Sequence, residues 1–196
     1  MPARPKITRE MLVDAAFTLV REEGHGALSV RRIAARLHCS TQPVLYQFPS
    51  VEALRRTAYE AADSFHTAYL LDFGEDEDPM AALGRRYVRF AIEERNLFRF
   101  LFQSDEFAGR TLDELIAAPE VAPLLRLLGE SAHIDAEQAA VLFRALFAAV
   151  HGFASLLANN AMRPDPEGIA ASLGEIYLGM LTRMGGKQDE PTVQEE

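Results

Sequence analysis

The chain has 196 residues, 48% of them hydrophobic and 25% charged, which is typical of a soluble globular protein with a sizeable core. Its single cysteine, Cys39, excludes an intramolecular disulfide and a cysteine-based metal site, and we expect neither a cofactor nor a metal. The first ten residues lack the apolar stretch of a signal peptide, so we expect a soluble, cytoplasmic protein with no membrane partner.

The net charge of −9 is divided unevenly along the chain. Residues 1–60 contain nine Lys and Arg against six Asp and Glu, which gives +3. The remaining residues contain eleven against twenty-three, which gives −12. A basic N-terminal part is attracted to phosphate, whereas an acidic remainder is repelled by it. The charge distribution therefore favours nucleic-acid binding by the N-terminal part.

Three helices are predicted in the first fifty residues, because apolar residues recur at helical spacing between polar caps. The first spans residues 9–23 and is ended by glycine, and the second spans residues 30–37. The third runs from Thr41 to about Gln47 and has Pro43 in its first turn, where the missing N–H costs little. The predicted N-caps of the three helices are Thr8, Ser29 and Ser40.

The second and third helices are joined by three residues only, which predicts a helix-turn-helix. We expect the apolar residues of these helices to pack together: Val30, Ile33, Ala34, Leu37, Val44, Leu45 and Phe48. The polar face of the third helix is then free to enter a major groove. Gln42 can bond an adenine edge there, and Thr41 or Pro43 can pack on a thymine methyl. Tyr46 and Gln47 are placed to contact phosphate.

Helical spacing continues through the rest of the chain, with an acidic break at residues 74–79. Ser50 caps a long fourth helix, 52–71, and five further helices follow. The first of these begins at Pro79, and the second spans residues 97–102 after the cap Asn96. The other three span residues 121–130, 136–159 after the cap Asp135, and 166–184 after the cap Asp165. We expect an all-α fold with a three-helix helix-turn-helix domain, a long fourth helix, a bundle of about five helices and a disordered acidic tail. The predicted domains are residues 1–50, 51–186 and 187–196.

An aromatic set in the C-terminal part has two interpretations, a plain core or the lining of an apolar pocket. Its members are Tyr87, Phe90, Phe98, Phe102, Phe107, Phe143 and Phe147. His151 follows Phe147 by one turn on a nearly all-apolar helix. We favour a hydrogen-bonded core histidine beside Gly152 over a catalytic or metal-binding residue at this position.

The last two helices are predicted to form a dimer interface. The apolar run 139–158 is long enough to raise the question of a membrane span, but Arg144, His151 and Ser155 within it favour a bundle helix. The final helix carries an apolar seam that needs a partner, formed by Ile169, Leu173, Ile176, Tyr177 and Met180. Two such helices from each of two chains suit a four-helix interface in a homodimer. Packing within one chain is the alternative, but two long apolar helices carry more surface than one small body hides.

The segment ITREMLVDAAFTLVREEGHGALSVRRIAARLHCSTQPVLYQFPSVEALRRTA resembles the N-terminal domain of the TetR family of transcriptional regulators. The resemblance implies backbone and phosphate contacts from Ser29, Arg31, Tyr46 and Gln47, base contacts from Thr41, Gln42 and Pro43, and a DNA-facing position for Ser40. Two departures stand out. Val51 replaces the usual Lys after Pro-Ser, which removes one cationic phosphate contact. His38 replaces the usual Gly of the turn, so a left-handed backbone there is mildly strained.

The segments ERNLFRFLF and FRALFAAVHGFASLL are similar to the landmarks of TetR regulators with a WHG-type C-terminal domain, with Phe147 in place of the usual Trp. This resemblance implies a small-molecule effector that binds among the aromatic set and His151. It also implies a repressor by default, although activation stays open.

The sequence thus predicts a ligand-responsive regulator whose homodimer reads a pseudo-palindromic double-stranded DNA operator, with recognition helices about 34–36 Å apart. An N-terminal arm with Arg4 and Lys6 either follows the DNA or is disordered. Two rivals from other classes are weaker. One is a helical enzyme that uses His151, for which no paired carboxylates, phosphate loop or nucleophile context is present. The other is a protein-interaction adaptor that uses the acidic C-terminal body.

Overall fold

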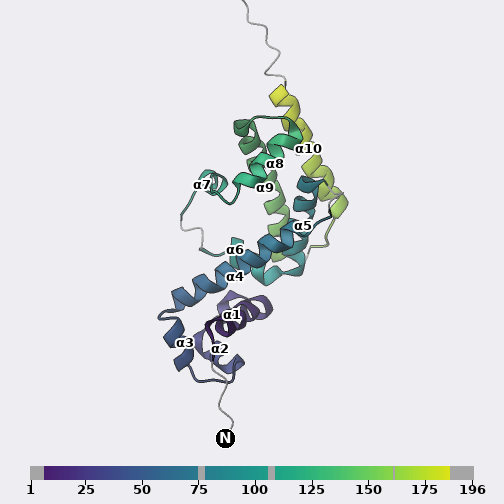
Figure 1. Ribbon diagram of the computed structural model, residues 1–196. Coiled ribbons are helices and arrows are strands. Elements are labelled where there is room, and N and C mark those ends of the chain that lie inside the picture. The colour runs from purple at the N-terminus through teal and green to yellow at the C-terminus, as the bar shows by residue number, and fades with distance from the viewer. Residues whose placement is uncertain (1–6, 75–77, 106–108, 161, 186–196) are drawn as a thin grey trace, which may run out of the picture. The chain divides into compact units, whose positions relative to one another are not determined.

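A computed structural model describes residues 7–74, 78–105, 109–160 and 162–185, and these residues form helices without any strand (Figure 1). The expected all-α fold is therefore confirmed. The helices are α1 (Arg9–Glu23), α2 (Val30–Arg36), α3 (Gln42–Gln47), α4 (Val51–Leu71), α5 (Pro79–Glu93), α6 (Arg95–Phe102), α7 (Leu112–Ile116), α8 (Ala122–Ala132), α9 (Ala136–Asn159) and α10 (Pro166–Gly185), with a 3-10 turn η1 (His25–Ala27). The N-terminal arm, Phe107 and the tail 187–196, on which predictions were made, lie outside the described residues.

The chain divides into two compact units. The head unit contains α1 to α4, the last turn of α5 from Phe90, and α6; the body unit contains the rest of α5 and α7 to α10. This division is based on which residues contact one another in the folded chain. The functional domain boundary at residue 50 stays a prediction.

Side-chain caps set most helix starts. The Thr8, Ser29 and Ser50 hydroxyls accept hydrogen bonds from backbone N–H groups three residues ahead. Asp135 and Gln138 form the expected capping box at the start of α9, and the Asp165 carboxylate accepts from the Gly168 N–H at 3.0 Å. These local signals explain why most predicted bounds agree with the structure within two residues.

Three local predictions were wrong. The N-cap of α3 is Thr41 rather than Ser40, and it makes no side-chain cap bond. Helix α6 begins at Arg95, because the Asn96 side chain binds the Arg21 carbonyl and does not cap its own helix. Helix α7 is absent from the predicted helices; Thr111 and Glu114 form a capping box that starts it.

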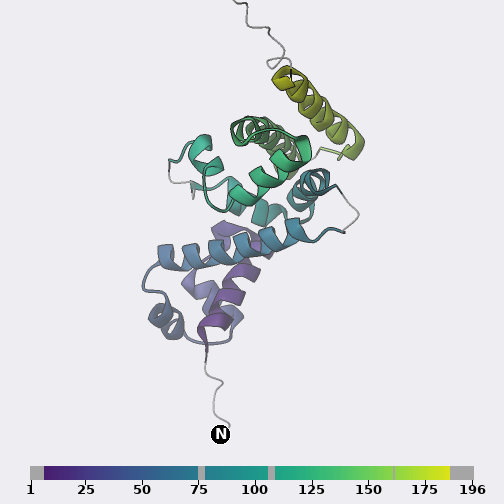
Figure 2. The same cartoon turned by 45° about the horizontal axis from the view of Figure 1, so that its top comes forward.

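The core of the head unit is closed by apolar side chains from every one of its helices. Figure 2 shows α1 crossing α4 at a steep angle, and these two helices are in contact. Fully buried side chains include Leu12, Leu19, Ile33, Val44, Leu54, Phe98 and Phe100. Because α6 supplies several of them, it is part of the same core as the helix-turn-helix.

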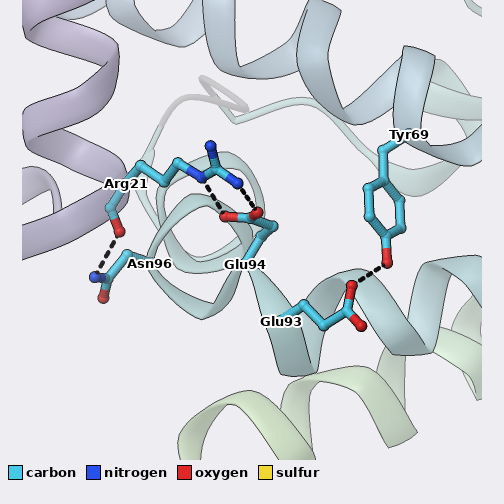
Figure 3. A network of polar contacts seen from close by, with 5 residues as sticks. All are labelled: Arg21, Tyr69, Glu93, Glu94 and Asn96. Carbon is cyan, nitrogen blue, oxygen red and sulfur yellow. Dashed lines mark hydrogen bonds and ion pairs between the residues drawn. The ribbon is translucent and has the colours of Figure 1, made fainter.

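A polar network joins the corner between α5 and α6 to α1 and α4 (Figure 3). The Arg21 guanidinium makes two hydrogen bonds to the Glu94 carboxylate, with Nε–Oε2 at 2.8 Å. Asn96 Nδ2 donates to the Arg21 carbonyl at 3.0 Å, and the Tyr69 hydroxyl donates to Glu93 at 2.7 Å. A bidentate Arg–carboxylate pair fixes orientation as well as distance. The corner is thus tied to α1 and to α4 by separate bonds.

In the body unit, α9 contacts α7, α8 and α10. Arg144 of α9 pairs with Asp113 of α7 at 2.6 Å. Helix α9 is the one described helix long and apolar enough to cross a membrane, which is weak evidence because core helices of soluble proteins meet the same test. It is buried along one face in the single chain, and no residue of α10 is fully buried.

Candidate nucleic-acid interface

The turn between α2 and α3 is formed by a left-handed residue. His38 has φ 50°, as expected from its position where glycine is usual. The Cys39 N–H donates to the Ala34 carbonyl at 2.9 Å and the His38 N–H donates to the Ala35 carbonyl at 3.1 Å, which is a Schellman ending. These bonds satisfy the end of α2 and redirect the chain sharply. A left-handed non-glycine residue costs about 1 kcal/mol, so the turn is mildly strained.

Helix α3 is held to the head by its inner face. Val44 is fully buried and Phe48, just beyond the helix, is 2% exposed. The Arg9 guanidinium lies 5.2 Å from the centre of the Phe48 ring and covers it. Pro43 occupies the first turn, as predicted. A six-residue helix is unstable alone, so these contacts fix its position.

The outer face of α3 is exposed. Ser40, Thr41 and Gln42 are exposed, Pro43 and Gln47 are half-buried, and the Tyr46 side chain is 85% exposed. Leu45, expected to pack inward with Val44 and Phe48, is instead 52% exposed. That expectation was wrong because two apolar residues already fill the inner side of this short helix.

Helix α2 carries three arginines in different environments. Arg32 pairs with Glu23, and Arg36 pairs with Glu22 at 2.8 Å. Arg31 is exposed, and no partner contacts it within the part of the chain that the structure describes. The Ser29 hydroxyl caps the same helix. The start of α2 therefore offers one cation and one helix N-terminus to an anion.

The start of α4 lacks a cation. The Ser50 hydroxyl accepts from the Ala53 N–H at 3.1 Å, and Val51, in place of the lysine that the family resemblance implies, is 50% exposed. The helix N-terminus alone can still attract phosphate there.

The predicted pocket residues fall into two aromatic clusters, one in each unit. In the head unit, Phe90 and Phe98 are buried and Phe102 is half-buried. His66 contacts the Phe90 and Phe102 rings edge-on, with centroids 4.7 and 5.1 Å away. Burial lowers the pKa of His66 to about 4. No local sequence pattern marks His66, because only tertiary packing surrounds it with rings.

In the body unit, Tyr87 is buried, and its hydroxyl is hydrogen-bonded to His151 Nδ1 at 2.9 Å. The Phe147 ring lies 6.0 Å from Tyr87 and 5.7 Å from His151, and Phe143 stacks on Phe147. Burial lowers the pKa of His151 and raises the pKa of Tyr87. His151 is thus a hydrogen-bonded histidine among aromatic rings.

The five predicted interface residues of α10 are all half-buried in the single chain. Ile176 and Met180 line a groove of about 410 Å³ together with Ala145 of α9. Glu175 and Arg183 add charged groups to its lining. The apolar seam is thus left only partly covered by its own chain.

Residues 80–177, half of the chain, match the family described as "Tetracyclin repressor-like, C-terminal domain". No curated protein matches the chain. Similar solved structures include a TetR-like transcriptional regulator from Rhodococcus sp. RHA1 (TM-score 0.62, 18% identity, 92% of this chain and 99% of that chain). A putative transcriptional regulator from Pseudomonas aeruginosa PAO1 is also similar (TM-score 0.63, 18% identity, 95% and 96%). So is a single-residue variant of TetR from Acinetobacter baumannii AYE, solved in complex with minocycline (TM-score 0.57, 19% identity, 94% and 100%).

An all-helical chain with a helix-turn-helix head is the architecture of a DNA-binding regulator. The chain belongs to the TetR family of transcriptional regulators. Members of this family are regulators rather than enzymes. The WHG-type subclass stays a prediction.

Proposed function

We propose that the protein is a homodimeric, cytoplasmic repressor that binds a pseudo-palindromic operator through α3 and leaves it when a small molecule binds. The observation that carries this proposal is the outer face of α3, which is polar and exposed while Val44 and Phe48 hold the helix from behind. A recognition helix needs this combination of a fixed backbone and free side chains.

The proposed DNA contacts are of two kinds, contacts to bases and contacts to the DNA backbone. Thr41, Gln42 and Pro43 are proposed to contact bases, because glutamine can bond adenine in two places and small apolar groups fit a thymine methyl. Five other residues are proposed to contact the DNA backbone: Ser29, Arg31, Ser40, Tyr46 and Gln47. Arg31 supports this assignment, since it keeps its charge uncompensated on a surface where its neighbours Arg32 and Arg36 are paired.

The dimer is proposed to form through α9 and α10. The α10 seam is only partly covered within its own chain, and a partly exposed apolar seam marks a protein-protein interaction site. It is formed by Ile169, Leu173, Ile176, Tyr177 and Met180. Two heads joined in this way can contact successive major grooves about 34–36 Å apart.

The effector is proposed to bind within the residues 51–186, among the aromatic set. The body cluster of Tyr87, Phe143, Phe147 and His151 supports an apolar molecule that carries a polar group, because aromatic rings surround the hydrogen-bonded pair of Tyr87 and His151. The Acinetobacter regulator was solved with minocycline, but that ligand is not inferred for this chain. The effector would act through α4, and the Arg21–Glu94 pair would carry part of any movement of α6 to α1.

The proposal is tested by fluorescence anisotropy with DNA from upstream of the protein's own gene. Affinity is expected to fall steeply with salt. Tyr46→Ala is expected to weaken binding to all sequences alike by roughly tenfold, since it removes a backbone contact. Gln42→Ala is expected to relax preference at one base pair only. Specific binding that is absent at low salt, with intact dimers, would favour a protein-interaction adaptor instead.

A further inference from the structure

Leu45 is a half-exposed apolar residue in the middle of α3. Its side chain is 52% exposed, whereas Val44 and Phe48 have no more than 2% of theirs exposed. Single exposed leucines are common on protein surfaces, so exposure by itself carries little. The position of Leu45 on the helix is what distinguishes it.

Residues three and four apart share one side of a helix, because each residue advances by about 100°. Leu45 therefore neighbours Gln42 and Thr41, both of them exposed. Pro43 and Gln47 share the opposite flank, and Tyr46 lies between the two flanks. The side of α3 with Thr41, Gln42 and Leu45 thus combines a methyl group, a carboxamide and a branched apolar side chain.

These three groups match a run of A·T pairs in the major groove. The thymine C5-methyl is the apolar group that base pairs display there, and apolar side chains recognise it by contact. A glutamine beside it can bond the N6 and N7 edge of adenine. A leucine has no donor for phosphate, so among the groups of the major groove the thymine methyl is the one that Leu45 can recognise.

We propose that Leu45 determines sequence specificity by packing against a thymine methyl in each half-site, next to the base pair bonded by Gln42. This inference rests on the proposed operator binding and adds the base that the Leu45 position selects. The partner that contacts Leu45 is DNA rather than a protein, because exposed polar residues surround Leu45 on α3. The uncompensated Arg31 also lies on the preceding helix, α2.

The test replaces each thymine of one half-site, singly, by deoxyuridine, which keeps base pairing and lacks only the C5-methyl. For the wild-type protein we expect one thymine whose replacement weakens binding roughly fivefold, the effect of about one buried methyl group. For Leu45→Ala we expect that loss to disappear at this thymine and to persist at any other sensitive thymine. Val51→Ala, a matched change at another half-exposed apolar residue, is expected to retain the wild-type pattern.

Two results would overturn the inference while leaving operator binding intact: a wild-type protein insensitive to every deoxyuridine, or a Leu45→Ala variant with the wild-type pattern. A wild-type protein that binds no operator would instead overturn the proposed function, and this inference with it. Circular dichroism checks that Leu45→Ala remains folded. Leu45→Gln, with a side chain of similar length and good helix propensity, repeats the test should the alanine variant unfold.

Discussion

The head and body units differ in how completely their helices bury apolar side chains. In the head, buried side chains come from all of its helices, and the outer face of α3 keeps mainly polar groups in solvent. In the body, α9 is buried along one face and α10 has no fully buried residue. The head thus buries apolar side chains from each of its helices, whereas the body leaves the apolar seam of α10 only partly covered. This contrast fits the proposed function, in which the head contacts DNA and the body joins two copies.

The largest expected effect comes from a charge in the seam of the body. Ile176→Asp places a carboxylate where the proposed dimer excludes water, so we expect dimerisation to weaken roughly a thousandfold. Operator affinity should fall with it, because a single head makes half of the contacts. Sedimentation velocity measures the first effect and anisotropy the second.

Ala171→Asp is the matched control, since Ala171 is exposed on the opposite side of α10. It should leave the dimer unchanged. A monomeric Ala171→Asp together with a dimeric Ile176→Asp would place the interface on a different face of α10.

The second effect concerns two histidines, the buried His66 and the half-buried His151, whose pKa values burial lowers. The pKa of His66 in the folded head is about 4, below its value of about 6.5 in an unfolded chain. Between these values the unfolded state binds more protons, so the free energy of unfolding falls as the pH falls from 6.5 towards 4. Above pH 6.5 both states are neutral and the effect vanishes. From about pH 7 to about pH 5 we expect a loss of about 2 kcal/mol from His66.

Urea unfolding at about pH 7, 6 and 5 measures this loss, with His66→Leu removing the His66 share of the pH dependence. His151→Leu in the body should remove a smaller share of the same sign, because His151 is only half-buried. Equal pH dependence in the wild type and His66→Leu would contradict the assignment to His66.

The smallest expected effect is a difference in operator binding between variants of two arginines in the head, Arg31 and Arg32. Arg31→Ala should weaken operator binding several-fold and reduce the dependence of log affinity on log salt by about one unit per half-site, because one phosphate contact is lost. Arg32→Ala, on the same helix, should change both quantities less, since Arg32 is held by Glu23. Salt titrations of both variants test this difference, and identical slopes would remove the distinction between paired and unpaired arginines.

The sequence by itself determined the helices, because periodicity and caps act within about four residues of each other. Asp135 and Gln138, or Ser50 and Ala53, could be paired without any knowledge of the fold. The pattern of Thr111 and Glu114 offered the same signal for α7 and was missed. The helix-turn-helix and the strained His38 also followed from local pattern and from the family resemblance.

Only the tertiary structure decided which side chains are buried or paired and which remain exposed. Arg21 and Glu94 are 73 positions apart, and no local pattern pairs them or keeps Asn96 from capping its own helix. No local pattern predicts the rings around His66 or the exposure of Leu45 either. Nor does one predict that glutamates pair with Arg32 and Arg36 but not with Arg31. Short-range propensities fix a helix and its ends, whereas burial and charge compensation depend on residues that meet only after the chain has folded.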